Sequence, residues 1–117
     1  MDLPADSCLL RVFVGEAARH AGRPLHEAIV LRAREARLAG ATVIRCVEGY
    51  GKSSRLHKSK VLRLSDDLPL VVEIVDSEER INAFLPELER MMPSGLVTLE
   101  KVRAHFCGGA KAPASPG

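Results

Sequence analysis

Apolar runs alternate with two helical stretches along the chain, and their order predicts a β-α-β-β-α-β domain. Residues 8–14 and 42–48 are apolar at nearly every position, as is typical of strands covered on both faces. Residues 61–75 predict an interrupted third strand, broken at 65–67 by turn-forming Ser-Asp-Asp. Residues 96–106 predict the last strand.

Two segments have the periodicity of amphipathic helices. The first begins at Pro24, since proline is favoured in the first turn, and Gly40 stands where a C-terminal cap belongs. The second follows the capping residues 76–77, and residues 93–95 end it. Pro86 lies inside this second pattern and is expected to kink the helix or shift its boundaries. The predicted buried faces consist of Leu25, Ile29, Ala33 and Ala36, and of Ile81, Phe84, Leu85, Leu88 and Met92.

This order of elements predicts the fold class. With right-handed crossovers it gives an α+β, ferredoxin-like βαββαβ sandwich, in which two helices cover one face of an antiparallel four-stranded sheet. Apolar residues occur on both sides of the strands, so we expect copies of the same subunit to bury the other face in an oligomer with closed symmetry. Residues 1–107 are expected to form this domain, and residues 108–117 a disordered tail rich in Ala, Pro and Gly.

Composition excludes several function classes. A net charge of +2 lacks the basic excess of a duplex-DNA binder, and 3% aromatic residues offer few stacking platforms, so no nucleic-acid partner is expected. The three cysteines are far apart, which argues against a disulfide framework or a structural zinc site. The first residues lack the features of a signal peptide and no apolar run approaches ~20 residues, so a cytoplasmic protein is expected.

The segment 49–60 is the strongest candidate for a functional site. Gly49 and Gly51 allow a sharp turn and a close approach of a ligand. The cations of this segment are Lys52, Arg55, His57, Lys58 and Lys60. Together with backbone N–H groups, they would suit a phosphate or carboxylate. A P-loop is excluded because Cys46 stands where that motif requires its first glycine. A solvated connection is the alternative, but strand connections usually need only ~2–5 residues.

Other candidates for chemistry are weaker. Lys101, Arg103 and His105 alternate along one face of the last strand, where a polar strand end is the simpler interpretation unless a ligand cleft lies beside it. No nucleophile has a recognisable supporting base, so we expect no enzymatic activity and no cofactor beyond an effector. A metal-binding protein of similar architecture would require His57 or Cys46 as a ligand, and the spacing gives no support for such a site.

Several segments together resemble the PII-like family called domain of unknown function 190 (DUF190). The resemblance runs from residue 8 to about residue 103, in the family's order. Its segments are residues 11–16 (RVFVGE), 24–30 (PLHEAIV), 38–43 (LAGATV), 48–51 (EGYG), 64–69 (LSDDLP), 73–76 (EIVD), 85–86 (LP) and 95–100 (GLVTLE).

DUF190 is similar to PII signal-transduction proteins, which are ferredoxin-like trimers with a long loop between the second and third strands. The resemblance implies a homotrimeric regulator that binds a small anionic effector, such as an adenine nucleotide, in clefts between subunits. It would signal through the loop 49–60 to a membrane transporter or an enzyme. The implied ligand-binding residues are Gly49, Gly51, Lys52, Arg55, His57, Lys58, Lys101 and Arg103.

One difference from PII proteins leaves an alternative open. The glycine-rich turn that PII proteins use after the third strand has no match here, because residues 76–79 (DSEE) are acidic. The alternative is a ligand-free protein-interaction module that uses the loop 49–60 to contact a partner such as a transporter.

Overall fold

The structure, a computed structural model, describes residues 4–47, 68–105 and 107 of the chain. Its main sheet has the strand order β4-β5-β1-β6, and every pair of neighbours is antiparallel. The strands of this sheet are β1 (Asp6–Gly15), β4 (Thr42–Arg45), β5 (Pro69–Asp76) and β6 (Leu96–Arg103). The other elements are the short strands β2 (Arg19–His20) and β3 (Arg23–Pro24) and the helices α1 (Leu25–Glu35) and α2 (Glu78–Met91).

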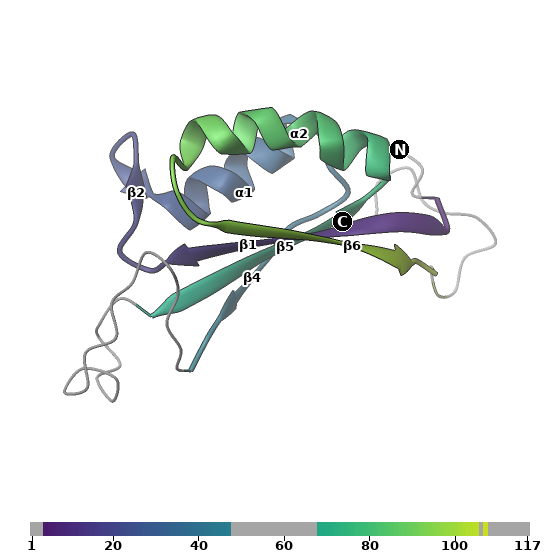
Figure 1. Ribbon diagram of the computed structural model, residues 1–117, viewed down its shortest axis with the longest axis horizontal. Coiled ribbons are helices and arrows are strands. Elements are labelled where there is room, and N and C mark those ends of the chain that lie inside the picture. The colour runs from purple at the N-terminus through teal and green to yellow at the C-terminus, as the bar shows by residue number, and fades with distance from the viewer. Residues whose placement is uncertain (1–3, 48–67, 106, 108–117) are drawn as a thin grey trace.

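Both helices lie on the same face of the main sheet (Figure 1). Helix α1 connects β1 with β4, and α2 connects β5 with β6, so each helix joins two strands that are parallel but not neighbours. This split arrangement is the predicted ferredoxin-like sandwich, and the prediction is confirmed.

The core lies between the helices and the sheet. In β1, Cys8, Leu10, Val12 and Val14 are buried, and the residues between them point to the opposite face, as the two-residue period of a strand requires. The predicted helix faces are confirmed, except that Ala36 and Leu85 are only partly buried. The buried helix-face residues are Leu25, Ile29, Ala33, Ile81, Phe84, Leu88 and, just after α2, Met92.

The C-terminus of α1 differs from the prediction that Gly40 caps it. The helix ends earlier, and Arg37 takes the left-handed conformation with φ 63°. Leu38 then donates its N–H to the carbonyl of Ala33 at 3.1 Å, and Arg37 donates to Arg34 at 3.0 Å. These two bonds form a Schellman motif, in which glycine is the usual residue at the left-handed position. The prediction was wrong because it placed the cap at the glycine rather than at the residue that closes the turn.

Helix α2 begins as predicted, with Ser77 as its N-cap, whose hydroxyl accepts a hydrogen bond from the N–H of Arg80 at 3.2 Å. The helix continues through Pro86, so this proline does not end it. Pro86 is exposed, and its ring has no N–H for the carbonyl of Asn82 one turn earlier.

The hairpin formed by β2 and β3 was not predicted. Ala21 and Gly22 connect its strands with φ values of 51° and 84°, and two positive values at the central positions are typical of a type I′ turn. The main-sheet strands also differ from the predicted bounds by a few residues. For example, β4 ends at Arg45, whereas the pattern predicted a strand up to residue 48.

Candidate functional site

The predicted ligand-binding residues fall into two groups. The loop residues lie outside the described part of the chain: they are Gly49, Gly51, Lys52, Arg55, His57 and Lys58. Lys101 and Arg103 lie within it, on the edge strand β6, and both are exposed. Neither side chain makes an ion pair or a hydrogen bond with another of the described residues. Both cations are therefore available to a ligand or a partner.

Lys101 and Arg103 lie at the end of the sheet where β1 begins. The register pairs Lys101 with Cys8 and Arg103 with Asp6. Because the buried Cys8 points toward the helices, both cations lie on the helix side of the sheet. His105, the third member of the predicted alternating set, is exposed two residues beyond the end of β6.

The described residues that flank the predicted loop lie at the opposite end of the sheet. After β4, Cys46 donates its N–H to the carbonyl of Pro69 at 3.1 Å, and Gly15 at the end of β1 pairs with Pro69. At ~3.3 Å per residue, the nine steps from Asp6 to Gly15 span about 30 Å. Figure 1 shows the arrowheads of β1 and β6 at opposite ends of the sheet. Within one subunit, Arg103 is thus far from the ends of the loop.

An ion pair joins two elements at the loop end of the sheet. The guanidinium of Arg45, at the end of β4, contacts the carboxylate of Glu16, just after β1. The N–H of Glu16 also donates to the carbonyl of Leu68 at 2.9 Å. Glu16 therefore connects β1 to the residues on both sides of the predicted loop.

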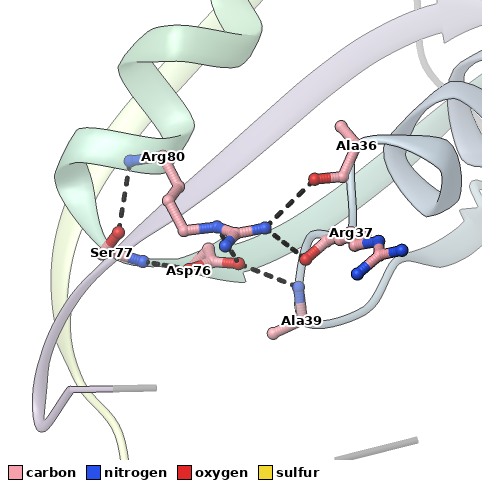
Figure 2. A network of polar contacts seen from close by, with 6 residues as sticks. All are labelled: Ala36, Arg37, Ala39, Asp76, Ser77 and Arg80. Atoms are coloured by element: carbon pink, nitrogen blue, oxygen red, sulfur yellow. Dashed lines mark hydrogen bonds and ion pairs between the residues drawn. The ribbon is translucent and has the colours of Figure 1, made fainter. Parts of the chain in front are cut away.

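A buried carboxylate lies on the helix side of the sheet. Asp76, the last residue of β5, is fully buried, and its carboxylate accepts hydrogen bonds from the N–H groups of Ala39 at 2.9 Å and Ser77 at 2.6 Å (Figure 2). The guanidinium Nε of Arg80 lies 3.5 Å from the same carboxylate, as an ion pair without a hydrogen bond at Nε. Three partners thus compensate the burial of this charge.

Arg80 extends the contact of Asp76 to the end of α1. Its Nη2 donates to the carbonyls of Ala36, at 3.1 Å, and of Arg37 (Figure 2). These carbonyls lie at the helix C-terminus, where the partial negative charge favours a cation. Asp76 and Arg80 therefore fasten the α1–β4 connection to the start of α2. The sequence marked Asp76 only as part of a helix start, because its partner Ala39 lies far away in the chain.

The face of the sheet opposite the helices has an apolar row across all four strands. The strand register pairs Ile44 with Val71, Val71 with Phe13, and Phe13 with Leu96. These four residues form the row. The two ends of this apolar row, Ile44 and Leu96, are 43% and 55% exposed. None of the described helices covers this face (Figure 1). Val71, in the middle of the row, is only 9% exposed, so the exposed apolar surface lies at the two ends of the row, and exposed apolar side chains of this kind are typical of an interaction surface.

Arg11 is the cation next to the apolar row. Its Nε lies 2.9 Å from Glu73 and its Nη1 lies 3.1 Å from Glu100, on the strands to either side. The hydrogen bond with Glu73 raises the pKa of Arg11, which keeps the guanidinium charged. A cation placed between two carboxylates leaves one surplus negative charge on this face.

Among the described residues, no three His, Cys, Asp or Glu side chains gather closely enough to hold a metal ion. Of the thiols, Cys8 is buried, Cys46 is half-buried and Cys107 is exposed. His57, the other ligand that a metal site would require, lies outside the described residues.

The sequence matches a known family. The model of DUF190, described as "Uncharacterized ACR, COG1993", matches residues 7–104. The chain belongs to the DUF190 family, as its motifs predicted. A UPF0166 protein of Aquifex aeolicus is 45% identical over 98 residues, which cover 84% of this chain and 92% of that protein. A UPF0166 protein of Methanocaldococcus jannaschii is 32% identical over 92 residues, which cover 78% of this chain and 84% of that protein.

Solved structures of a PII-like protein show the same fold as this DUF190 chain. One is CPII, a nitrogen regulatory PII-like protein from Thiomonas intermedia K12, bound to ADP, AMP and bicarbonate. It matches with a TM-score of 0.55 and 17% identity, over 85% of this chain and 88% of CPII. A second structure of CPII, bound to ADP and bicarbonate, has the same TM-score and coverage at 18% identity. The DUF190 domain therefore has a PII-like, ferredoxin-like fold.

The described helices of this domain, of 11 and 14 residues, are both too short to cross a bilayer.

Proposed function

We propose that this DUF190 protein is a regulator rather than an enzyme, which binds a small anionic effector between the subunits of a homotrimer. It signals to a partner, a transporter or an enzyme, through the loop 49–60. The observation that carries the proposal is the position of the predicted cations, because Lys101 and Arg103 lie at the far end of the sheet from the residues that flank the loop.

The distance between these two cations and the residues that flank the loop argues for a site between subunits. A small ligand held at the base of the loop lies about 30 Å from Arg103 of the same subunit, which exceeds the reach of an arginine side chain. A second subunit can bring its own Lys101 and Arg103 to that base. The exposed ends of the apolar row supply a reason for subunits to associate, since burying them removes Ile44 and Leu96 from water.

The free cations define the chemistry of the effector. Lysine supplies a point charge and arginine a planar fork, and both bind phosphate and carboxylate oxygens strongly. The ligands of CPII, ADP, AMP and bicarbonate, carry such oxygens. An adenine nucleotide or bicarbonate is therefore the first class of effector to test.

A calorimetric titration with ADP, AMP and bicarbonate tests the proposal. We expect saturable binding of at least one of them, and a loss of this binding in the Lys101→Ala/Arg103→Ala variant. The matched control is Arg34→Ala/Arg90→Ala, which removes two exposed helix arginines without a salt-bridge partner among the described residues. Binding that survives the first variant, or falls equally in both, contradicts the proposed site.

The start of α2 favours a second candidate, a protein-interaction module without a ligand. The N–H groups of Ser77 and Arg80 already donate to side chains of the chain itself, and the exposed Glu78 and Glu79 follow. Two N–H groups of this helix start are therefore already engaged, and the two acids disfavour an anion such as phosphate there. The alternative predicts flat titrations with all three ligands, and weaker capture of a partner by the Lys52→Ala/Arg55→Ala variant.

A further inference from the structure

Arg45 is a cation at the loop end of the sheet that was not among the predicted ligand-binding residues. It is the last residue of β4, and the register pairs it with the buried Leu70 of β5. Because residues paired across neighbouring strands point to the same face, the side chain of Arg45 starts on the helix side of the sheet. This side chain is nevertheless 64% exposed, so a ligand can contact it.

Glu16 is the single side chain with which Arg45 pairs in the described part of the chain. The strand order places β5 between β4 and β1, so Arg45 extends across the central strand to Glu16, just after β1. Neither side chain is buried, and an ion pair in contact with water stabilises a protein only weakly. A phosphate or carboxylate ligand can therefore compete with Glu16 for the guanidinium.

An exchange of partners at Arg45 leaves the backbone in place. The N–H of Glu16 donates to the carbonyl of Leu68 at 2.9 Å, and the N–H of Cys46, next to Arg45, donates to the carbonyl of Pro69 at 3.1 Å. These backbone bonds do not depend on the ion pair. Separating Arg45 from Glu16 therefore requires only rotations of the two side chains, which are common when proteins bind their partners.

We propose that Arg45 belongs to the effector site and that Glu16 occupies it in the empty protein, so that an anionic effector binds by displacing the Glu16 carboxylate. The inference rests on the proposed function and adds to it a ligand-binding arginine and an internal competitor for that arginine. In the proposed site, a second subunit supplies Lys101 and Arg103, which lie on the helix side of their sheet, as Arg45 does. One ligand between subunits can therefore contact all three cations.

The displacement connects ligand binding to the loop 49–60. Among the described residues, Arg45 makes the only side-chain hydrogen bond or ion pair of β4. An effector that takes Arg45 from Glu16 removes this contact between β4 and the end of β1, a few residues before the chain enters the loop. The planar guanidinium favours a ligand that offers two oxygens on one atom, as the phosphate groups of a nucleotide and bicarbonate do.

Calorimetric titrations of Glu16 and Arg45 variants with ADP, AMP and bicarbonate test the displacement. Glu16→Gln removes the competitor and should tighten binding by about 2- to 5-fold, as expected for an exposed ion pair. Arg45→Gln should weaken binding by at least about 10-fold, since it removes charged hydrogen bonds to the ligand. When Arg45→Gln is already present, Glu16→Gln should change the affinity by less than about 1.5-fold, because no guanidinium remains for the carboxylate to occupy.

The matched control is Glu35→Gln, which removes the carboxylate from another exposed contact with an arginine, Arg32 on α1. It should leave the affinity for all three ligands within about 1.5-fold of wild type. If Glu16→Gln tightens binding equally with and without Arg45, its carboxylate only repels anions from the site. That result would overturn the displacement.

A crystal structure of the wild-type protein with the ligand that binds tests the inference without any variant. We expect the guanidinium of Arg45 at hydrogen-bond distance from a phosphate or carboxylate oxygen, and separated from Glu16. An intact ion pair between Arg45 and Glu16 beside the bound ligand, or Arg45→Gln that binds like wild type, overturns the inference. If Lys101→Ala/Arg103→Ala still loses binding in that case, the proposed function stands without Arg45. Flat titrations of both wild type and Glu16→Gln overturn the proposed effector site and this inference together.

Discussion

Asp76 accepts a hydrogen bond from the backbone N–H of Ala39 at 2.9 Å, although 37 positions separate the two residues in the chain. The bond ties the end of the central strand β5 to the connection that leads into β4. Since β4 has only four residues and, among the described residues, one neighbouring strand, its position depends strongly on how this connection is held. The buried Asp76 therefore helps to set the position of β4 in the sheet.

The contacts of Asp76 predict a large loss of stability on its removal. Asp76→Ala leaves the N–H groups of Ala39 and Ser77 and the charge of Arg80 without their partner. Breaking a buried pair in this way costs about 3–5 kcal/mol. Urea unfolding should show this loss of unfolding free energy. Glu35→Ala, which breaks the exposed contact with Arg32, should cost at most ~1 kcal/mol, and equal effects of the two changes would contradict the assigned role of Asp76.

The left-handed conformation of Arg37 predicts that glycine stabilises this position. At φ 63°, a residue with a Cβ is strained in the left-handed conformation, and glycine avoids this strain. The substitution keeps the backbone carbonyl that Arg80 contacts. Arg37→Gly should therefore raise the unfolding free energy by about 0.5–1 kcal/mol, measured by thermal or urea unfolding. The same substitution at Arg34, inside α1, should lower it by about 1 kcal/mol. A loss of stability in Arg37→Gly would contradict the Schellman turn.

Replacing Gly95, in the turn between α2 and β6, is expected to lower the stability of the domain. Its φ is 142°, and a Cβ added there would lie 2.4 Å from Cε of Met92. Gly95→Ala should lower the unfolding free energy by about 1–3 kcal/mol, because the backbone is strained for other residues and Met92 must move. Gly40→Ala is the control, with no atom within 4 Å of the added Cβ, and its effect should stay within about 0.5 kcal/mol. Indistinguishable melting curves for the two variants would refute this account of Gly95.

The order of elements could be predicted from the sequence because it depends on local periodicity. The buried alternation of β1 and the buried face of α2, with Phe84 and Leu88, are visible as repeats of two and of three to four residues. The end of α1 could not be placed, because the turn closes on an arginine at a position where the usual signal is a glycine.

Long-range contacts were the part of the site that the sequence could not show. Nothing in the local pattern joins Asp76 to Ala39, or Arg11 to the two glutamates on either side of it, because these pairs form only once the strands and helices are packed. The resemblance to DUF190 did imply Lys101 and Arg103 as ligand-binding residues. It could not indicate that they lie at the opposite end of the sheet from the flanks of the loop, which follows from the strand register.

Arg11 predicts how the uncovered face contributes to assembly. In a free subunit, its exposed contacts with Glu73 and Glu100 contribute at most ~1 kcal/mol each. In an oligomer that buries this face, Arg11→Ala would leave two carboxylates buried without a cation, at a cost of about 3–5 kcal/mol. We therefore expect Arg11→Ala to raise the dissociation constant of the oligomer by at least ~100-fold, measured by analytical ultracentrifugation.

The control for Arg11→Ala is Arg32→Ala on α1, which also removes an arginine placed between two glutamates, Glu35 and Glu87. Arg32 lies on the helix layer, so its loss should leave the dissociation constant within about 3-fold of wild type, because it costs only exposed contacts. Equal dissociation constants for Arg11→Ala and Arg32→Ala would mean that the face around Arg11 stays in water. The subunits of the proposed homotrimer would then have to associate without burying the apolar row.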